Sequence, residues 1–96
     1  MKFMVTWRVH QEKRPEIMKL WATLTPQQRA DAGPGVKIVG RWHNLAEFTG
    51  VAICEASDTA ALSVYLMQWN GSMDMDIAPV LDDEESAAAG RKALGL

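Results

Sequence analysis

Hydrophobic and polar side chains alternate along the first ten residues of the chain. The apolar positions are Phe3, Val5, Trp7 and Val9. A period of two, with β-branched and aromatic residues, predicts a β-strand over 2–10 with one buried face. The segments 36–43, 50–56 and 73–80 alternate in the same way or carry a short apolar run, so we predict strands there too.

Two segments between these strands have helical spacing instead. Apolar residues recur every three or four positions over 15–24 and over 58–69, which predicts two helices. Thr25 and Gln28 have the spacing of a capping box, so a short second helical piece should follow the first and reach about Ala32.

The order of elements is therefore β-α-β-β-α-β, followed by a weaker helix over 82–96 that opens with acidic residues and closes with basic ones. This order predicts one domain over 1–96 with a ferredoxin-like α+β fold, in which helices cover one face of a four-stranded antiparallel sheet. The other face should carry Met4, Val39 and Val80 among polar residues. An open face of this kind favours pairing between two copies, and we predict a homodimer.

Alternation along the second strand divides its residues between the two faces. The residues predicted to face the helices are Val36, Ile38, Gly40 and Trp42, and those predicted to face away are Lys37, Val39, Arg41 and His43. A glycine at position 40 indicates a β-bulge or a close approach by another group. The residues 44–49 are predicted to form a short polar connection to the next strand.

Tryptophan is unusually common, with four residues against three for phenylalanine and tyrosine together. The four are Trp7, Trp21, Trp42 and Trp69. All are predicted to face the space between sheet and helices, where they form either the core or a pocket for an aromatic or planar ligand. In a pocket, Tyr65, Asn70 and His43 would supply polar groups, and the methionines would make the wall adaptable.

Composition narrows the classes of partner. A net charge of −2 gives no electrostatic reason to expect nucleic acid or a membrane surface, and no apolar run approaches the roughly 20 residues that span a bilayer. The single cysteine, Cys54, excludes an internal disulfide, suits a reducing cytoplasm and is predicted to be a small buried residue. No glycine-rich phosphate loop or nucleophile motif is present, so no cofactor is predicted.

Ionisable residues suggest two kinds of site. His10 and His43, with a carboxylate such as Asp74, have the composition of a two-histidine, one-carboxylate metal site. They lack the close spacing of a metal-binding motif, so hydrogen-bonded surface histidines are the competing interpretation. Arg41 is the best candidate to bind a carboxylate or phosphate, and the competing interpretation is an ion pair between strands or subunits, with Glu55 as one possible partner.

Three segments together resemble a known family. They are GRWHNLAEFTGVAICEASD, MQWN and IAPVLDDEE, which begin at Gly40, Met67 and Ile77. In these residues the chain is similar to an uncharacterised bacterial family, domain of unknown function family 3303. The resemblance implies a dimeric α+β barrel, a superfamily that includes cofactor-independent monooxygenases and haem-degrading enzymes with pockets between sheet and helices. It implies no catalytic residue.

The leading hypothesis is a cytoplasmic homodimer that binds a small organic molecule in a tryptophan-lined pocket. The candidate ligand-binding residues are Trp7, Arg41, Trp42, Tyr65, Trp69 and Asn70. If the protein is an enzyme, the reaction should resemble that of an oxygenase or isomerase, with His43 or His10 as acid or base. The alternatives are a non-catalytic dimeric binding module and a metal-binding dimer that uses the same two histidines.

Overall fold

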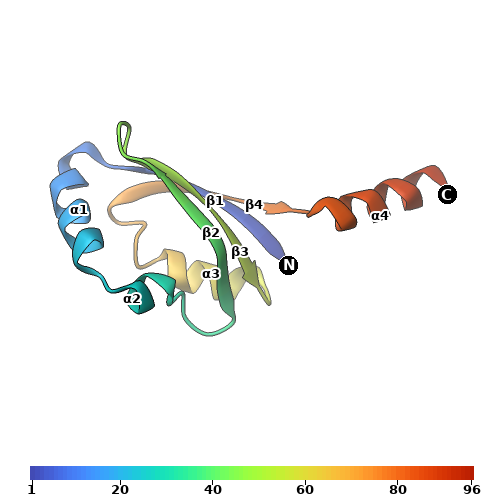
Figure 1. The fold of residues 1–96 in the computed structure, drawn as a ribbon, viewed down its shortest axis with the longest axis horizontal. Helices are drawn as coiled ribbons and strands as arrows, with labels where there is room; N and C mark the ends of the chain where they lie inside the picture. Colours follow the sequence, from blue (N-terminus) through green and yellow to red (C-terminus); the bar gives the residue numbers. More distant parts are fainter.

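The computed structural model covers residues 1–96 and confirms the predicted ferredoxin-like order of elements (Figure 1). The strands are β1 (Lys2–Val9), β2 (Val36–Asn44), β3 (Thr49–Ala56) and β4 (Met73–Val80). The helices are α1 (Arg14–Thr23), α2 (Pro26–Ala30), α3 (Thr59–Leu66) and α4 (Asp83–Leu94), and a 3-10 turn at Gln11–Lys13 precedes α1. None of these helices has both the length and the apolar character that crossing a membrane requires.

The four strands form one antiparallel sheet in the order β2-β3-β1-β4. Helices α1, α2 and α3 all lie on the concave side of this sheet, so the opposite face is open (Figure 1). The core lies between the sheet and α3, where Leu62 and Leu66 pack against Phe3, Val5 and their neighbours. Alternation on β1 therefore buries the residues that the sequence predicts.

Helix ends follow the capping chemistry of the sequence. Thr25 and Gln28 form the predicted capping box of α2, although that helix ends at Ala30. Asp58 caps α3 by accepting the backbone N–H of Ala61 at 2.8 Å. Helix α3 ends at Leu66, earlier than predicted, and a series of turns follows it.

A β-bulge in β2 overturns the predicted faces of the second half of that strand. Ile38 pairs with Cys54 and Gly40 with Ile53, so Val39 is an extra residue that has no partner of its own. One extra residue moves every later side chain to the other face. Arg41 therefore pairs with Ala52 on the helix-covered face, where it was predicted to face away.

Trp42 and His43 exchange faces for the same reason. His43 now pairs with Gly50, which also pairs with the inward-facing Trp7. Trp42 turns to the open face and is 61% exposed. The prediction that Trp42 faces the helices is wrong, while the bulge that Gly40 indicated is present.

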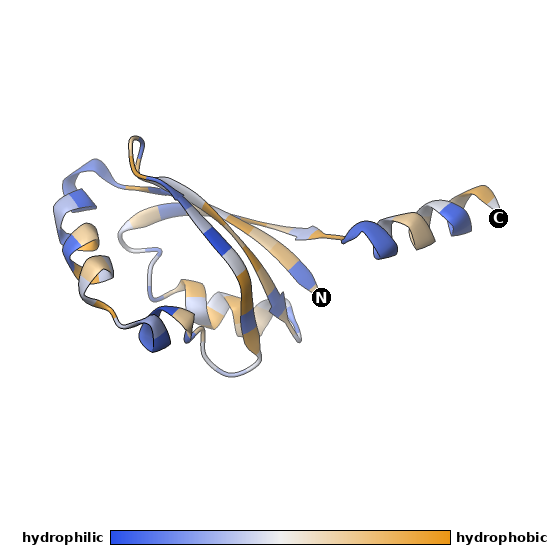
Figure 2. Cartoon of the chain, viewed as in Figure 1, coloured by the Kyte–Doolittle hydropathy of each residue, from blue (hydrophilic) through white to orange (hydrophobic).

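Helix α4 extends away from the sheet and the other helices (Figure 1). The whole chain, α4 included, measures 53 Å along its longest axis. The base of α4 is held by Lys2, whose ammonium group lies 3.3 Å from Asp82 and 3.1 Å from Glu85. The pKa of Lys2 is raised by the hydrogen bonds to these two carboxylates. Hydrophilic residues gather at the start of the helix and again near its end (Figure 2), and all of its residues are exposed.

Candidate functional site

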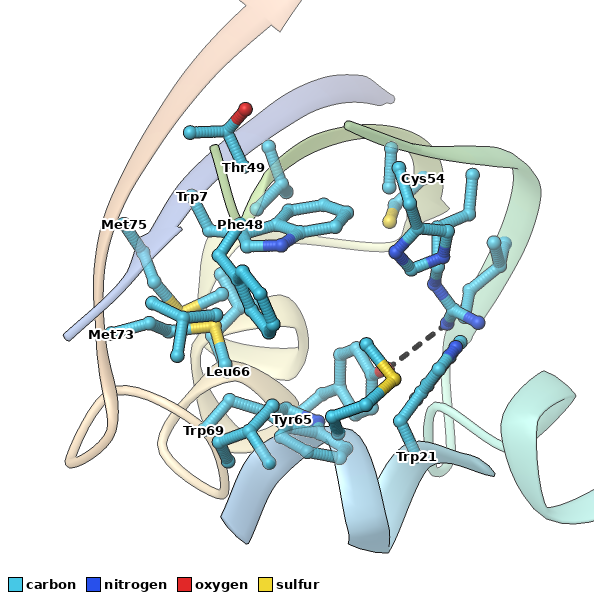
Figure 3. A pocket seen from close by; sticks show the side chains of 18 of the residues that line it. Trp7, Trp21, Phe48, Thr49, Cys54, Tyr65, Leu66, Trp69, Met73 and Met75 are labelled. Carbon is cyan, nitrogen blue, oxygen red and sulfur yellow. Dashed lines mark hydrogen bonds between the residues drawn. The ribbon is translucent and has the colours of Figure 1, made fainter. Parts of the chain in front are cut away.

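A cavity of about 80 Å³ lies between the sheet and the helices that cover it (Figure 3). Nineteen residues line it, and sixteen of them are hydrophobic. The volume is several times the roughly 10–15 Å³ that a single water molecule needs on this measure. An apolar cavity of this kind with a few polar groups is typical of small-molecule sites.

Aromatic rings form much of the cavity wall. The ring of Trp21, from α1, lies 5.2 Å from that of His43 and 6.2 Å from that of Trp69. Trp7, from β1, meets His43 edge-on at 5.7 Å. Tyr65 closes the wall from α3. Separations and angles of this kind are favourable between aromatic rings, so the wall is suited to receive another planar group.

Arg41 is the one permanently cationic side chain in this wall. Its Nη1 and Nη2 each donate a hydrogen bond to the carbonyl oxygen of Arg29 at 3.1 Å, near the end of α2. Nη2 also donates to the hydroxyl oxygen of Tyr65 at 3.2 Å (Figure 3). The guanidinium carbon lies 4.7 Å from the centre of the Trp21 ring, a cation–π contact. These contacts fix the guanidinium against the aromatic wall.

His43 and Cys54 have shifted pKa values in this environment. Burial lowers the pKa of His43, and the positive charge of Arg41 lowers it further. Burial raises the pKa of the Cys54 thiol, and Arg41 opposes that rise. At neutral pH His43 is therefore a neutral imidazole, able to accept a proton, and Cys54 is a thiol and not a thiolate.

Trp69 contributes a buried donor without a partner. It lies in the turns that follow α3 and lines the cavity. Its indole Nε1 is buried and makes no hydrogen bond. A buried N–H that lacks an acceptor costs free energy, so this group is available to an acceptor that enters the cavity.

The β2–β3 connection covers one end of the cavity, contrary to the prediction of a merely polar link. Leu45 and Phe48 both line the cavity, and Phe48 has a positive φ of 54°. Arg14 of α1 holds this connection by donating to the carbonyl oxygen of Glu47 at 3.3 Å. Its guanidinium also lies 5.1 Å from the centre of the Phe48 ring. The hairpin and α1 are thus joined beside the cavity.

One protein family matches nearly the whole of this chain. The model of the family described as Domain of unknown function (DUF3303) matches residues 1–94. The chain belongs to this family. The resemblance seen in the three sequence segments is thereby confirmed over nearly the whole chain. No curated protein matches it.

Solved structures with the same fold include an antibiotic biosynthesis monooxygenase. Its crystal structure superposes on this chain with a TM-score of 0.51 and 15% sequence identity. The match covers 85% of this chain and 100% of that chain. Rv0793 from Mycobacterium tuberculosis is similar with a TM-score of 0.44 and 12% identity, over 85% of this chain and 96% of that one. At such identity the first likeness supports the ferredoxin-like fold and no particular activity.

The cavity brings together five of the predicted site residues and leaves three outside. Those that line it are Trp7, Arg41, His43, Tyr65 and Trp69. Trp42 lies on the open face because of the bulge, and Asn70 is exposed and does not line the cavity. His10 lies elsewhere, with its Nε2 3.1 Å from a carboxylate oxygen of Asp74.

The histidine pair does not form the metal site considered from the sequence. No group of three or more His, Cys, Asp or Glu side chains is arranged to hold a metal ion. Glu55, a possible partner of Arg41, instead lies 3.6 Å from the ammonium group of Lys2. Within one chain, Arg41 therefore makes no ion pair with Glu55.

Several cavity residues were not identified from the sequence. They include Ile17, Leu45, Phe48 and Cys54. Helical spacing had already placed Ile17 on the buried stripe of α1, and the predicted burial of Cys54 is confirmed at 2% exposure. Nothing in the pattern of the connection distinguished Leu45 and Phe48 from solvent-exposed residues.

A second hollow of about 240 Å³ lies among α1, α2 and the end of α3. It shares Trp21, Tyr65 and Trp69 with the first cavity, but four of its nine lining residues are polar or charged. We place the site in the first cavity because Arg41, His43 and Cys54 line that cavity and not the second, and because its lining is more apolar.

Proposed function

We propose that this protein binds a small planar organic molecule in the cavity between the sheet and α1–α3. The observation that carries the proposal is the lining itself: apolar and aromatic side chains among which Arg41, His43, Thr49, Tyr65 and the free Nε1 of Trp69 supply polar groups. Such a wall gains free energy by covering an apolar ring, and its few polar groups orient the ligand.

Native mass spectrometry of gently purified protein tests this proposal. We expect added organic mass on the wild-type chain, and we expect Met18→Trp, which fills the cavity, to remove it. Met67→Trp is the matched control, because Met67 is 71% exposed and lies outside the cavity. Added mass that survives Met18→Trp, or a cavity that takes no planar aromatic compound in titrations, would contradict the proposal.

We also propose that two copies associate through the open face of the sheet. The register places Met4, Ile53 and Ala78 side by side on that face, beside the exposed Trp42. Arg8 and Asp74 lie opposite each other in the register of β1 and β4, on the same face. A second copy can therefore place its positive charge against the negative charge of this one. This apolar surface with mixed charge supports a homodimer.

A catalytic role for His43 is the second candidate function, of the oxygenase or isomerase type. A neutral imidazole beside an apolar cavity can take a proton from a bound carbon or oxygen acid. Turnover of a bound compound that is lost in His43→Gln while binding persists would support this role. Binding without turnover by the wild-type protein would favour a non-catalytic binding module. His10 contacts Asp74 outside the cavity, and His10→Gln is the control variant.

We further propose that the protein works in the cytoplasm. Its one cysteine is a buried free thiol and forms no disulfide. Reducing compartments retain such thiols.

A further inference from the structure

Arg41 is the only permanently charged residue among the nineteen that line the cavity. It forms no ion pair with any carboxylate of the chain, because the ion pairs of lysine and arginine are confined to Lys2, Arg8 and Lys13, which lie outside the cavity. Charged groups that line apolar cavities are costly unless they are paired, because the surroundings replace water poorly. An uncompensated cation at this place therefore needs an explanation.

The protein groups that contact Arg41 are all neutral. The carbonyl oxygen of Arg29 and the hydroxyl of Tyr65 accept three of its hydrogen bonds, and the Trp21 ring lies against its plane. A guanidinium has five N–H groups. The two that remain, one on Nε and one on Nη1, have no acceptor in the protein.

The charge of Arg41 reaches the other polar groups of the cavity. It lowers the pKa of His43 and acts in the same direction on Cys54. In both cases the positive charge of Arg41 favours the form of the neighbouring group that has lost its proton. His43 and Cys54 are neutral at pH 7, so neither of them balances the positive charge.

We infer that the ligand of this cavity is an organic anion, a planar aromatic molecule with a carboxylate or similar group that binds Arg41. This inference rests on the proposed function and names the chemical class of the ligand. The anionic oxygens accept hydrogen bonds from the guanidinium, which binds carboxylates in a fixed planar geometry. The ring then lies against Trp7 and Trp21, within the aromatic wall.

The inference is tested with two probes of nearly equal shape, benzoate and benzamide. Binding is followed by the indole N–H signals of the four tryptophans in ¹⁵N-labelled protein. Trp7, Trp21 and Trp69 are the reporters that line the cavity. We expect benzoate to bind at least tenfold more tightly than benzamide, because only benzoate neutralises Arg41. A ratio of ten corresponds to about 1.4 kcal/mol.

Two variants separate charge from structure. Arg41→Gln removes the charge and retains a donor for the Arg29 carbonyl, and it should abolish the preference for benzoate. Arg41→Lys keeps the charge without the planar fork and should retain part of the preference. Thermal unfolding of both variants reports any structural role of Arg41, which would lower stability without changing the benzoate-to-benzamide ratio.

The outcomes separate this inference from the proposal beneath it. Benzamide binding within twofold of benzoate to the wild-type protein would overturn the anion and leave the planar-ligand cavity intact. A tenfold preference that persists in Arg41→Gln would overturn the role of Arg41. If neither probe shifts any tryptophan signal, that result would overturn the ligand cavity and the inference together.

Discussion

The residue His43 is exposed as a whole although it lines the cavity, and partial burial and a neighbouring cation both oppose its protonation. Burial is the larger cause of its lowered pKa, and the charge of Arg41 is the second. We predict an NMR titration midpoint below the usual 6.5, and a partial return toward 6.5 in Arg41→Gln. Lys37→Gln, which removes a positive charge from the open face of the same strand, should leave the midpoint unchanged.

The lowered pKa of His43 also makes the stability of the fold depend on pH. The unfolded chain takes up a proton at His43 more readily than the folded one, so the free energy of unfolding falls as pH drops below about 6.5 and stops falling below the folded pKa. His43→Gln should remove this part of the pH dependence in urea unfolding. A pH dependence that is identical in the variant would contradict the lowered pKa.

Two glycines in the sheet each lie beneath a tryptophan ring. A Cβ atom at Gly50 would lie 2.5 Å from Cε2 of Trp7 and 2.8 Å from the backbone oxygen of Trp42. At Gly40 the three nearest atoms would all belong to the ring of Trp42, with Cζ3 at 2.9 Å. That ring can move because Trp42 is 61% exposed.

Overpacking should therefore be costly at one glycine and mild at the other. We predict that Gly50→Ala lowers the free energy of unfolding by about 1–3 kcal/mol, and that Gly40→Ala lowers it by clearly less. Equilibrium urea unfolding of the two variants measures both values. Equal losses would show that Trp7 can shift as freely as Trp42.

At the scale of elements, α4 depends on its first turn because nothing packs along its length. The side chain of Asp82 accepts the backbone N–H of Glu85 at 2.8 Å, and the side chain of Glu85 accepts the backbone N–H of Asp82 at 3.1 Å, which completes a capping box. The bond from the Glu85 N–H is the main cause of the lowered pKa of Asp82, with Lys2 contributing.

We predict that Asp82→Ala frays α4 while the sheet stays folded. Backbone ¹³Cα shifts over 83–94 should move toward random-coil values, and those of β1 should not. The same loss should occur in the wild-type chain as pH falls below about 4, because a carboxyl with a lowered pKa stabilises the fold only while it is ionised. Asp83→Ala, which removes an acidic residue that makes no capping bond, is the control and should have a smaller effect.

At the scale of the whole molecule, one face of the sheet is covered by helices and the other is not. Covering only one face leaves Met4 37% exposed at the centre of the open side. In the proposed homodimer this residue would lie in the interface, whereas Met67, beyond α3, would not.

We predict that Met4→Glu weakens the dimer and that Met67→Glu does not. Light scattering coupled to size exclusion should report a dimer for the wild-type chain and the second variant, and a larger monomer fraction for the first. Both variants add the same charge, so net repulsion does not explain a difference. A monomeric wild-type chain would overturn the proposed association.

The sequence alone determined the fold class and most of the element positions. Period-two alternation along β1 and helical spacing over α3 are local properties of the sequence. The structure retains both patterns, because a shift of either one would expose core residues to solvent. Caps at Thr25 and Asp58 are equally local, since their hydrogen bonds join residues three positions apart. The buried Cys54 and the tryptophans Trp7 and Trp69 could be identified in the same way.

Only the tertiary structure decided which residues enter the cavity from β2 and from the hairpin. Gly40 indicated a bulge, but which residue is left without a partner depends on how β2 pairs with β3. The bulge brings Arg41 and His43 inside and turns Trp42 out. Phe48 enters the wall because Arg14, thirty-three positions before the neighbouring Glu47, holds the hairpin against α1. The chemistry of the site thus arises from contacts between distant segments, whereas its scaffold follows from local patterns.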